Sequence, residues 1–527
     1  MKDKLLEMLE SFEKVSSLNR RDFLRIAGLI GAGATLSAGS AGGRGVKGGS
    51  EMAKLITRRL GRTERQVTTL GLGGQASIQW TGKGIDPVAI IEKAYRLGIN
   101  YMDTSNVYGP SQQNYGKAFR NLGLSPAASN YDPVARKKLF VATKTHYRSA
   151  RRPDGGWFRT DFSEGMSDDF KVASSVDDVR RSLSQMFGDG RGGYPEGAYL
   201  DSIQFHNLNT MDDVDMLFQG FDDPTPNREW MGSLAAMLDL REGTNATGLN
   251  PKREKLVRHI GITGHWNTAA HMLAIRQDSK RIFDTLLVTV NASDGKYMGH
   301  RHNAIEVARA ADMGIIGMKV FADAAYYHKD ARFSNNPDDV YLGVGSEDLP
   351  SRDLIQYALS FQGISTLITG IGHIDDDPSK CQLEQNLLAA QMEDPLDPAA
   401  MKSIEDRVTA LGKDEANSYF QRRAMGLTAP HNVGVEVDSP APVMGRQAVR
   451  ISWDTAYAGS VPIDRYDVLR DGKVIGAIPH QPQITQKRFN YKDVMDKDGK
   501  PGSSSYAVRS VDAAGAQAQS PSIRAES

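Results

Sequence analysis

The chain has 527 residues, too many for one ordinary hydrophobic core, and its 40% apolar and 24% charged residues are typical of a globular protein. Lysine and arginine together number 64, and aspartate and glutamate together also number 64. The chain therefore has no net charge that would attract nucleic acid or an acidic membrane surface. The single cysteine, Cys381, excludes an intramolecular disulfide, a four-cysteine zinc site and a cysteine-bound iron–sulfur cluster. Any redox chemistry must therefore use a bound organic cofactor, and we expect no metal site.

The first 50 residues have the pattern of an export segment followed by a glycine-rich linker. Arg20 and Arg21 precede Phe23 and Leu24, and a short, glycine-rich apolar run follows over residues 26–33. The run is weaker than the roughly 20 apolar residues that a membrane-spanning helix needs. The segment resembles a twin-arginine signal, which implies the twin-arginine export machinery as a partner and a periplasmic or other extracytoplasmic location. An ordinary helix start with two surface arginines is the alternative.

Between residues 68 and 370, short apolar runs alternate with amphipathic segments, which is typical of a parallel α/β fold. Helices are predicted at 87–97, 175–187, 304–313 and 351–361, where apolar residues return every three or four positions. The runs predicted as strands are 68–73, 100–104, 139–144, 201–206, 259–263, 286–291, 315–321 and 366–370. Eight strands with intervening helices predict a (β/α)8 TIM barrel over residues 54–425. A doubly wound open sheet is the alternative, but no strand precedes a Gly-x-Gly-x-x-Gly turn.

Beyond residue 430 the pattern changes to the strict alternation of β-strands. Val449, Ile451 and Trp453 share one face of a predicted strand, and Asp471-Gly472 is a hairpin-turn pair. The stretches 451–453, 466–472 and 506–512 resemble a fibronectin type III module, so we predict a small all-β sandwich over residues 430–527. Such modules space or adhere, so this one is a candidate for contact with a cell surface or polysaccharide and is expected to perform no chemistry.

Polar residues end three consecutive predicted strands of the barrel. Asp103, Lys144 and His206 occupy these positions, and Tyr108 follows Asp103 by five residues in the loop. Carboxyl ends of parallel strands meet on one face of a barrel, and barrel enzymes place their chemistry on that face. Taken singly, each residue has a structural explanation, such as a helix cap, a solvated strand end or a core histidine. Their arrangement at successive strand ends favours a shared site.

These side chains can together deliver a proton to a carbonyl oxygen. Carbonyl reduction needs a hydride on carbon and a proton on oxygen, and a free tyrosine has a pKa of about 10. We expect the Lys144 ammonium to lower the pKa of Tyr108, and Asp103 to keep Lys144 charged. His206 can donate a hydrogen bond that orients the carbonyl. No side chain supplies a hydride, so a nicotinamide must.

Several motifs resemble those of the aldo-keto reductases. They are 59–63, 98–109, Lys144, His206, 261–264, Met318-Lys319 and 370–386. The resemblance spans residues 54–425 and implies a barrel that binds NADPH in an extended pose without a Rossmann fold. It implies the catalytic tetrad Asp103, Tyr108, Lys144 and His206. It also implies cofactor contacts at Thr263, Gly264, His265, Asn291, Lys319, Gly370, Gly372, Gln385 and Asn386.

The cofactor region departs from the family pattern in three places. Thr263-Gly264 replaces a Ser-Asn pair that holds the carboxamide, and Leu287 stands where a glutamine would complete that contact. Gln382 stands where an arginine for the 2′-phosphate is common. Lys380 or His373 could replace it, because one cationic group is what a phosphate needs. We expect NADP(H) in preference to NAD(H).

The leading hypothesis is therefore an exported reductase of a small aldehyde, ketone or sugar carbonyl, with Tyr108 as general acid. The alternative is a catalytically idle, cofactor-binding barrel that acts as an extracytoplasmic sensor or surface-binding module. Hydrolysis on the same barrel would need paired carboxylates or a metal cluster at the strand ends, and the sequence shows neither.

Overall fold

The computed structural model describes residues 55–151, 172, 174–226, 230–423, 426–437, 448–495 and 503–525. The predicted twin-arginine segment lies outside these residues. Within these ranges, no helix combines the length and the apolar character needed to cross a membrane.

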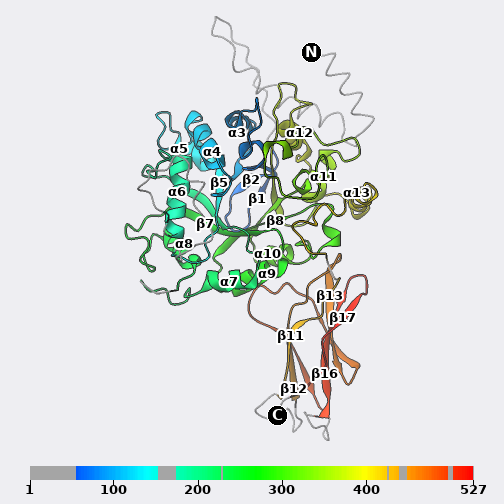
Figure 1. The fold of residues 1–527 in the computed structure, drawn as a ribbon. Helices are drawn as coiled ribbons and strands as arrows, with labels where there is room; N and C mark the ends of the chain where they lie inside the picture. The colour runs from blue at the N-terminus through cyan, green and yellow to red at the C-terminus, as the bar shows by residue number, and fades with distance from the viewer. Residues whose placement is uncertain are drawn as a thin grey trace, which may run out of the picture.

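Eight parallel strands form a closed barrel with helices around it (Figure 1). Their order is β10-β3-β4-β5-β6-β7-β8-β9, so each strand pairs with its neighbours in sequence and the last strand, β10, closes on the first, β3. The strands are β3 (Leu70–Gly73), β4 (Tyr101–Asp103), β5 (Phe140–Thr145), β6 (Leu200–Phe205), β7 (Val257–Gly264), β8 (Phe283–Thr289), β9 (Gly314–Met318) and β10 (Ile364–Thr369). The predicted (β/α)8 barrel is confirmed.

The predicted first strand is divided at Thr69. β1 (Thr57–Arg59) and β2 (Gln66–Thr68) pair as an antiparallel hairpin outside the barrel, and only Leu70 onward joins the parallel sheet. Leu60 and Val67 of this hairpin pack with Tyr101 and Phe140 in a small apolar cluster inside the barrel. The hairpin therefore fills one end of the barrel interior.

The helices between the strands cover the outside of the barrel, and their apolar faces pack on the strands in one large core cluster. Several helices start at a side-chain cap: Asp86 accepts a hydrogen bond from Val88 N before α3, and Ser174 accepts one from Asp177 N before α6. The helices are α3 (Pro87–Arg96), α4 (Ser111–Asn121), α5 (Pro133–Lys138), α6 (Ser175–Phe187), α7 (Met211–Phe218), α8 (Ser233–Glu242), α9 (Thr268–Gln277), α10 (Ala304–Ala310), α11 (Ser351–Leu359), α12 (Gln382–Ala389) and α13 (Pro398–Ala410).

The C-terminal region consists of two antiparallel sheets around a separate core. One sheet has the order β11-β12-β15 and the other β14-β13-β16-β17, with β18 pairing β16. Val449, Ile451 and Trp453 are fully buried, as their alternation predicts, and the pair Asp471-Gly472 turns the chain between β13 and β14 with φ angles of 48° and 78°. The strands are β11 (His431–Val437), β12 (Ala448–Asp454), β13 (Ile463–Arg470), β14 (Lys473–Pro479), β15 (Phe489–Val494), β16 (Ser505–Asp512), β17 (Gln517–Gln519) and β18 (Ile523–Arg524).

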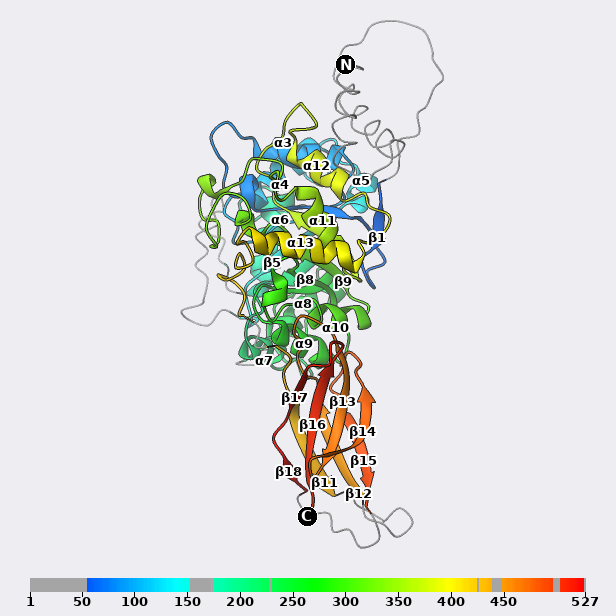
Figure 2. The same cartoon turned by 90° about the vertical axis from the view of Figure 1, so that its right-hand side faces the viewer.

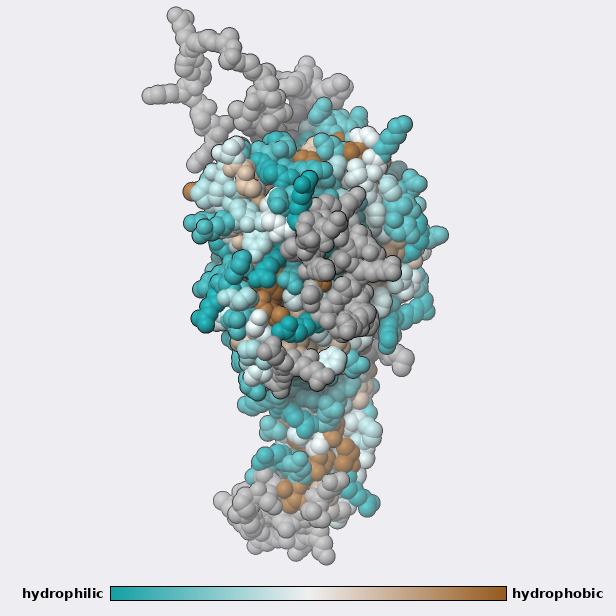
Figure 3. Space-filling view, turned by 60° about the vertical axis from the view of Figure 1, so that its left-hand side comes forward, coloured by the Kyte–Doolittle hydropathy of each residue, from teal (hydrophilic) through white to brown (hydrophobic). Residues whose placement is uncertain are grey.

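The β-sandwich lies beside α9 and α10 of the barrel and extends away from it (Figures 1 and 2). Asn303, just before α10, exchanges two hydrogen bonds with the main chain of Ala458, at 2.9 and 3.2 Å. Arg276 of α9 lies 3.5 Å from the Asp454 carboxylate. Most of the described barrel surface in Figure 3 is hydrophilic, whereas apolar residues gather on part of the sandwich. The sandwich is thus attached to the flank of the barrel by specific polar contacts.

Candidate active site

The strand ends bring the four predicted catalytic side chains together. Asp103 ends β4, Lys144 lies near the end of β5, and His206 directly follows β6, while Tyr108 lies in the turn between β4 and α4. Lys144 Nζ forms an ion pair with Asp103 and donates a hydrogen bond to the Thr104 carbonyl at 2.8 Å. The Tyr108 ring centroid is 5.0 Å from Lys144 Nζ and 5.7 Å from the His206 ring, which it meets edge to face.

The ion pair of Asp103 and Lys144 is almost completely removed from solvent, since each side chain is 1% exposed. Burial raises the pKa of Asp103 and lowers the pKa of Lys144, and the attraction between the two charges opposes both changes. Lys144 also keeps its hydrogen bond to Thr104 O. The ion pair, whose two charges nearly cancel, is therefore held firmly beside Tyr108.

The pKa of Tyr108 changes in the opposite direction from the sequence-based expectation. Burial raises it well above 10, and the negative charges of Asp103 and Asp323 raise it further. The expected lowering by Lys144 fails because Asp103 compensates the ammonium charge at close range. Tyr108 therefore keeps its phenolic proton at neutral pH.

The imidazole of His206, which lies next to Tyr108, is neutral. Burial lowers its pKa well below 6.5, and its neighbours His146 and Lys144 lower it further. Its Nδ1 atom is hydrogen-bonded to Ser105 Oγ at 3.2 Å, and its ring centroid lies 4.1 Å from that of His146. The imidazole is thus fixed in position by the residue two places after Asp103.

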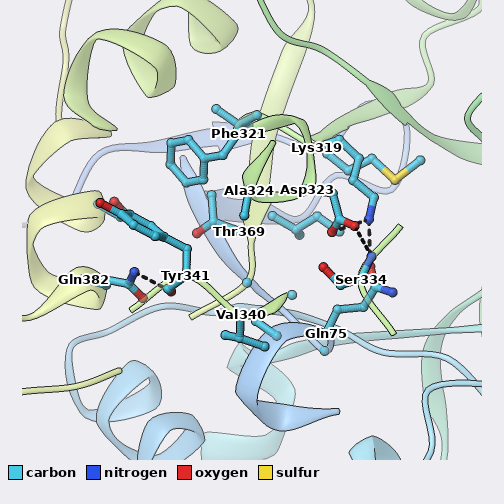
Figure 4. A pocket seen from close by; sticks show the side chains of 18 of the residues that line it. Gln75, Lys319, Phe321, Asp323, Ala324, Ser334, Val340, Tyr341, Thr369 and Gln382 are labelled. Carbon is cyan, nitrogen blue, oxygen red and sulfur yellow. Dashed lines mark hydrogen bonds and ion pairs between the residues drawn. The ribbon is translucent and has the colours of Figure 1, made fainter. Parts of the chain in front are cut away.

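A cleft with a volume of about 130 Å³, partly open to solvent, lies on the same face of the barrel. Asp103, Tyr108 and Lys144 line it, and so do residues from both halves of the loop that follows β9. Figure 4 shows Lys319 and Asp323 on one side of the cleft and Gln382 and Tyr341 on the other. The cleft therefore reaches from three of the four predicted catalytic side chains to the start of α12, whereas His206 does not border it.

Three of the predicted cofactor residues line this cleft: Lys319, Gly370 and Asn386. The other six do not border it; they are Thr263, Gly264, His265, Asn291, Gly372 and Gln385.

Asn291 and His265 are bound by other parts of the protein. The Asn291 amide exchanges hydrogen bonds with the Asn417 amide, at 2.8 and 3.1 Å, and donates to Lys319 O at 3.0 Å. Nδ1 of His265 is hydrogen-bonded to Asn207 Oδ1 at 3.0 Å, and its ring packs against Phe333.

Lys319 is bound to its neighbours within the cleft. Its Nζ donates to Gln75 Oε1 at 3.0 Å and to Asp323 Oδ1 at 3.1 Å (Figure 4). Burial acts against ionisation of Asp323, but the Lys319 and Lys329 ammonium groups outweigh it and lower the carboxyl pKa. Residues 322–324 all have left-handed backbone, with φ between 47° and 69°, a conformation that costs of order 1–3 kcal/mol per non-glycine residue. Asp323 anchors this strained turn, because its Oδ2 also accepts from Ser334 N at 2.7 Å.

The Gln382 side chain points inward and links the main chains of two separate segments. Its Oε1 accepts hydrogen bonds from Gly372 N at 2.8 Å and His373 N at 3.3 Å, while its Nε2 donates to Tyr341 O at 2.9 Å and to Gly343 O. It thereby joins the turn after β10 to the loop that follows β9 (Figure 4). Gln75, Asp323 and Tyr341 are cleft residues that the sequence interpretation missed. Gln75 follows Gly73-Gly74 at a strand end, a signal that could have found it, whereas Asp323 and Tyr341 lie in a long loop without a recognisable pattern.

Within the described ranges, no cluster of three or more histidine, cysteine or acidic side chains is arranged to hold a metal ion.

Comparisons with known proteins point to one family. The aldo/keto reductase family model matches residues 69–340, slightly more than half of the chain. Solved structures that resemble the chain include a putative aldo-keto reductase from Pseudomonas aeruginosa, 21% identical with a TM-score of 0.37, covering 64% of this chain and 95% of that one. Another is an aldo/keto reductase from Klebsiella pneumoniae in complex with NADP and acetate, 15% identical with a TM-score of 0.37, covering 67% of this chain and 95% of that one.

Two further named proteins match shorter stretches of the chain. The uncharacterized oxidoreductase YqkF of Bacillus subtilis is 26% identical over 168 residues, which are 32% of this chain and 44% of that protein. The L-galactose dehydrogenase of Arabidopsis thaliana is 35% identical over 97 residues, which are 18% of this chain and 27% of that protein. The chain thus spans less than half the length of these two relatives. With the barrel, the residues at its strand ends and a family match over half its length, the chain belongs to the aldo/keto reductase family.

Proposed function

We propose that this protein is a nicotinamide-dependent reductase of a small-molecule aldehyde, ketone or sugar carbonyl, with Tyr108 as the general acid. One observation carries the proposal: Tyr108 lies between the buried Lys144–Asp103 pair and neutral His206 at the wall of a cleft. Placing three ionisable groups at buried strand ends is costly unless they act together.

Tyr108 would hold the proton until the carbonyl oxygen needs it. Its raised pKa keeps the phenol protonated in the resting enzyme. The alkoxide that forms on a reduced carbonyl is a much stronger base than a phenolate, so proton transfer from the phenol is downhill. Lys144, 5.0 Å from the ring centre, would stabilise the phenolate that remains. Asp103 would keep Lys144 in place for this step.

A bound nicotinamide dinucleotide would supply the hydride to the carbonyl carbon. The near part of the cleft offers one free polar atom to such a cofactor, and glycines let the walls around it pack closely against one another. A Cβ added to Gly74 would lie 2.7 Å from Asp103 O, and one added to Gly370 would lie 2.8 Å from the Ala76 side chain. Thr369 Oγ1 is buried on the cleft wall with no partner in the described part of the chain, so it is free to bind a ligand.

The far part of the cleft gives little support to the expected preference for NADP(H). Gln382, where a family arginine would bind the 2′-phosphate, is occupied by four main-chain groups. Of the two substitute cations, Lys380 lies 3.6 Å from Asp377 and His373 lies 3.5 Å from Asp375. Either would have to leave its carboxylate to meet a phosphate. We therefore propose that the protein accepts both NADH and NADPH, with at most a small preference for NADPH.

The idle, ligand-binding barrel remains the second candidate. It is favoured by one observation: Asn291, expected to contact the cofactor, is saturated by Asn417 and Lys319. Such a barrel would bind dinucleotide and turn over nothing.

Absorbance at 340 nm distinguishes the two candidates. Purified protein is mixed with NADH or NADPH and a panel of aldehydes, ketones and aldoses, and cofactor affinity is measured separately by quenching of intrinsic fluorescence. We expect turnover by the natural protein and strongly reduced turnover by Tyr108→Phe at unchanged cofactor affinity. Tight cofactor binding without turnover by either protein would support the idle barrel instead.

We further propose that the protein is exported by the twin-arginine machinery to the periplasm, and that the fibronectin type III-like sandwich holds the barrel near a surface or polysaccharide. The export proposal rests on Arg20 and Arg21 with the apolar run after them. Fractionation of cells that produce the natural chain and the Arg20→Lys, Arg21→Lys variant tests it. Retention of the natural chain in the cytoplasm would contradict export.

A further inference from the structure

Two histidines are buried between α9 and the start of α10, on the flank of the barrel that carries the sandwich (Figures 1 and 2). His271 lies in the first turn of α9, and His300 lies in the loop between β8 and α10. Both are fully buried, and their ring centroids are 5.1 Å apart. Neither borders the cleft, so the proposed reaction does not use the pair.

The two imidazoles make very few hydrogen bonds for buried polar groups. His300 Nε2 is hydrogen-bonded to the His265 carbonyl at 3.2 Å, so in the neutral ring Nε2 carries the proton and Nδ1 a lone pair. That Nδ1 atom and both ring nitrogens of His271 have no hydrogen-bond partner among the described residues. Because buried polar atoms are usually paired, three unpaired nitrogens in one place call for an explanation other than stability.

Protonation of the pair is opposed in the folded protein. Burial lowers the pKa of His271 well below 6.5, and the neighbouring His300 and His265 lower it further. The Thr263 main chain acts in the opposite direction but is outweighed. Burial lowers the pKa of His300 to about 4, and only the His265 carbonyl counteracts it. Both rings are therefore neutral at pH 7.

The charged groups on the surrounding elements do not compensate a positive charge on either ring. The ionisable side chains of α7, α9, α10, β7, β12 and the loop before α10 are Asp212, Asp213, Asp215, Arg258, His259, Arg276, Asp294, Lys296, Arg301, His302, Glu306, Arg309, Arg450 and Asp454, besides the pair itself. None of these side chains contributes to the pKa of His271 or His300. Once protonated, the two rings would be buried cations without a counter-ion.

His300 also belongs to the segment by which the barrel binds the sandwich. Its main-chain oxygen accepts a hydrogen bond from Asn303 N at 3.3 Å, just before α10 begins. The Asn303 side chain in turn exchanges two hydrogen bonds with the Ala458 main chain of the sandwich. The His271 ring packs closely against the end of β7, since a Cβ added to Gly264 would lie 2.6 Å from its Nε2. Because both rings are fully buried, neither reaches water unless this flank opens.

We propose that His271 and His300 form an acid-sensitive lock, which holds the sandwich to the barrel while both rings are neutral and opens this flank when they are protonated. Two unpaired cations with ring centres 5.1 Å apart in the interior are strongly unfavourable, whereas water hydrates them in the open state. Because the closed state has the lower pKa values, the contact is most stable above about pH 6.5 and weakens as the pH falls towards 4. The lock is independent of the proposed reductase activity.

Hydrogen exchange of the full-length protein, measured by mass spectrometry at pH 7.5 and pH 5.0, tests the lock. The rates are corrected for the intrinsic effect of pH on amide exchange. For His300 alone, a pKa of 6.5 in the open state and about 4 in the closed state raises the opening constant about 30-fold between these pH values. We expect at least this acceleration in peptides that cover residues 268–277, 300–310 and 456–458. An equal acceleration throughout the chain would indicate global acid unfolding and would overturn the proposal.

The double variant His271→Leu, His300→Gln removes both titratable rings, and glutamine can still donate to the His265 carbonyl. We expect the acceleration at pH 5.0 to disappear in this variant. His302→Gln is the matched control, because His302 is a partly exposed histidine of the same loop, bonded to Glu306 at 3.3 Å, and it should keep the full effect. If His271→Leu prevents folding, His300→Gln alone should still remove the 30-fold share. Unchanged pH dependence in the folded variants, or an equal loss in His302→Gln, would contradict the lock.

A metal ion is the other occupant that two unpaired imidazoles could bind, because neutral imidazole is a common zinc ligand. Thermal unfolding of the full-length protein at pH 7.5 is therefore followed with and without zinc chloride. We expect no stabilisation by Zn²⁺. Stabilisation that is lost in His271→Leu, His300→Gln would assign the pair to a metal site and overturn the lock.

Discussion

Replacing Lys144 with methionine should destabilise the barrel far more than an ordinary lysine replacement does. The substitution removes the ion-pair partner of Asp103 and the hydrogen bond to Thr104 O, and it leaves a carboxylate buried at 1% exposure. Breaking a buried pair on one side costs about 3–5 kcal/mol, because the remaining charge is uncompensated. Removing both charges with Asp103→Leu and Lys144→Met together should recover at least about 2 kcal/mol of that loss.

The assay is urea-induced unfolding of the four proteins of this double-mutant cycle, with the barrel transition followed separately from that of the sandwich. Lys402→Met provides the matched control, because Lys402 and Asp406 form an ion pair on α13 in which the side chains are 64% and 63% exposed. An exposed pair of this kind contributes about 0–1 kcal/mol. If the two replacements at the buried pair had additive effects, or if Lys144→Met cost no more than Lys402→Met, the coupling described here would be refuted.

Three further outcomes are expected. Tyr108→Phe keeps the ring contact with His206 but has no proton to donate. Its kcat/KM for carbonyl reduction should therefore fall at least about 100-fold, with unchanged cofactor affinity. A smaller loss would argue against general acid catalysis by Tyr108. Burial raises the pKa of Asp294 from 3.8 to about 7, so between these pH values the folded state holds a proton that the unfolded state releases. The free energy of unfolding should therefore fall by up to about 4 kcal/mol as the pH rises from 4 to 7. Urea unfolding at both pH values should show that this difference is reduced in Asp294→Asn. Asn303→Ala removes both hydrogen bonds to Ala458 and should speed protease cleavage between barrel and sandwich, while equal cleavage rates would show that this contact does not hold the two together.

The barrel and the position of the four central side chains could be predicted from the sequence for a simple physical reason. Parallel strands in a barrel end on one face, so Asp103, Lys144 and His206, each at the end of a predicted strand, had to lie near one another. The hairpin turn at Asp471-Gly472 could also be predicted from the local sequence, since this pair readily adopts the left-handed backbone that the turn requires.

Contacts between distant residues could not be predicted in this way. Asn291 is bonded to Asn417, 126 positions later, and no local pattern indicates that partner. The inward orientation of Gln382 depends on the loop at Tyr341. The pKa of Tyr108 is raised mainly by burial, then by Asp103, and further by Asp323, a residue of the long loop after β9. These features follow from how loops return across the face of the barrel.

The break at Thr69 shows a related limit of pattern reading. The strand predicted over residues 68–73 crosses a boundary in the structure, because hydrogen bonding assigns Thr68 to the hairpin strand Gln66–Thr68 and Leu70–Gly73 to the barrel. Hydrophobicity alone indicates that the run is extended and buried, whereas the choice of partner strand depends on the rest of the fold.

Transfer of deuterium tests the central claim most directly. The protein is incubated with an α-hydroxy aldehyde and with NADH or NADPH that carries deuterium in the transferable position at C4, and the alcohol product is analysed by mass spectrometry. The account predicts one deuterium on the former carbonyl carbon with the natural protein and a greatly reduced yield with Tyr108→Phe. An alcohol without deuterium, or equal yields from the two proteins, would contradict it.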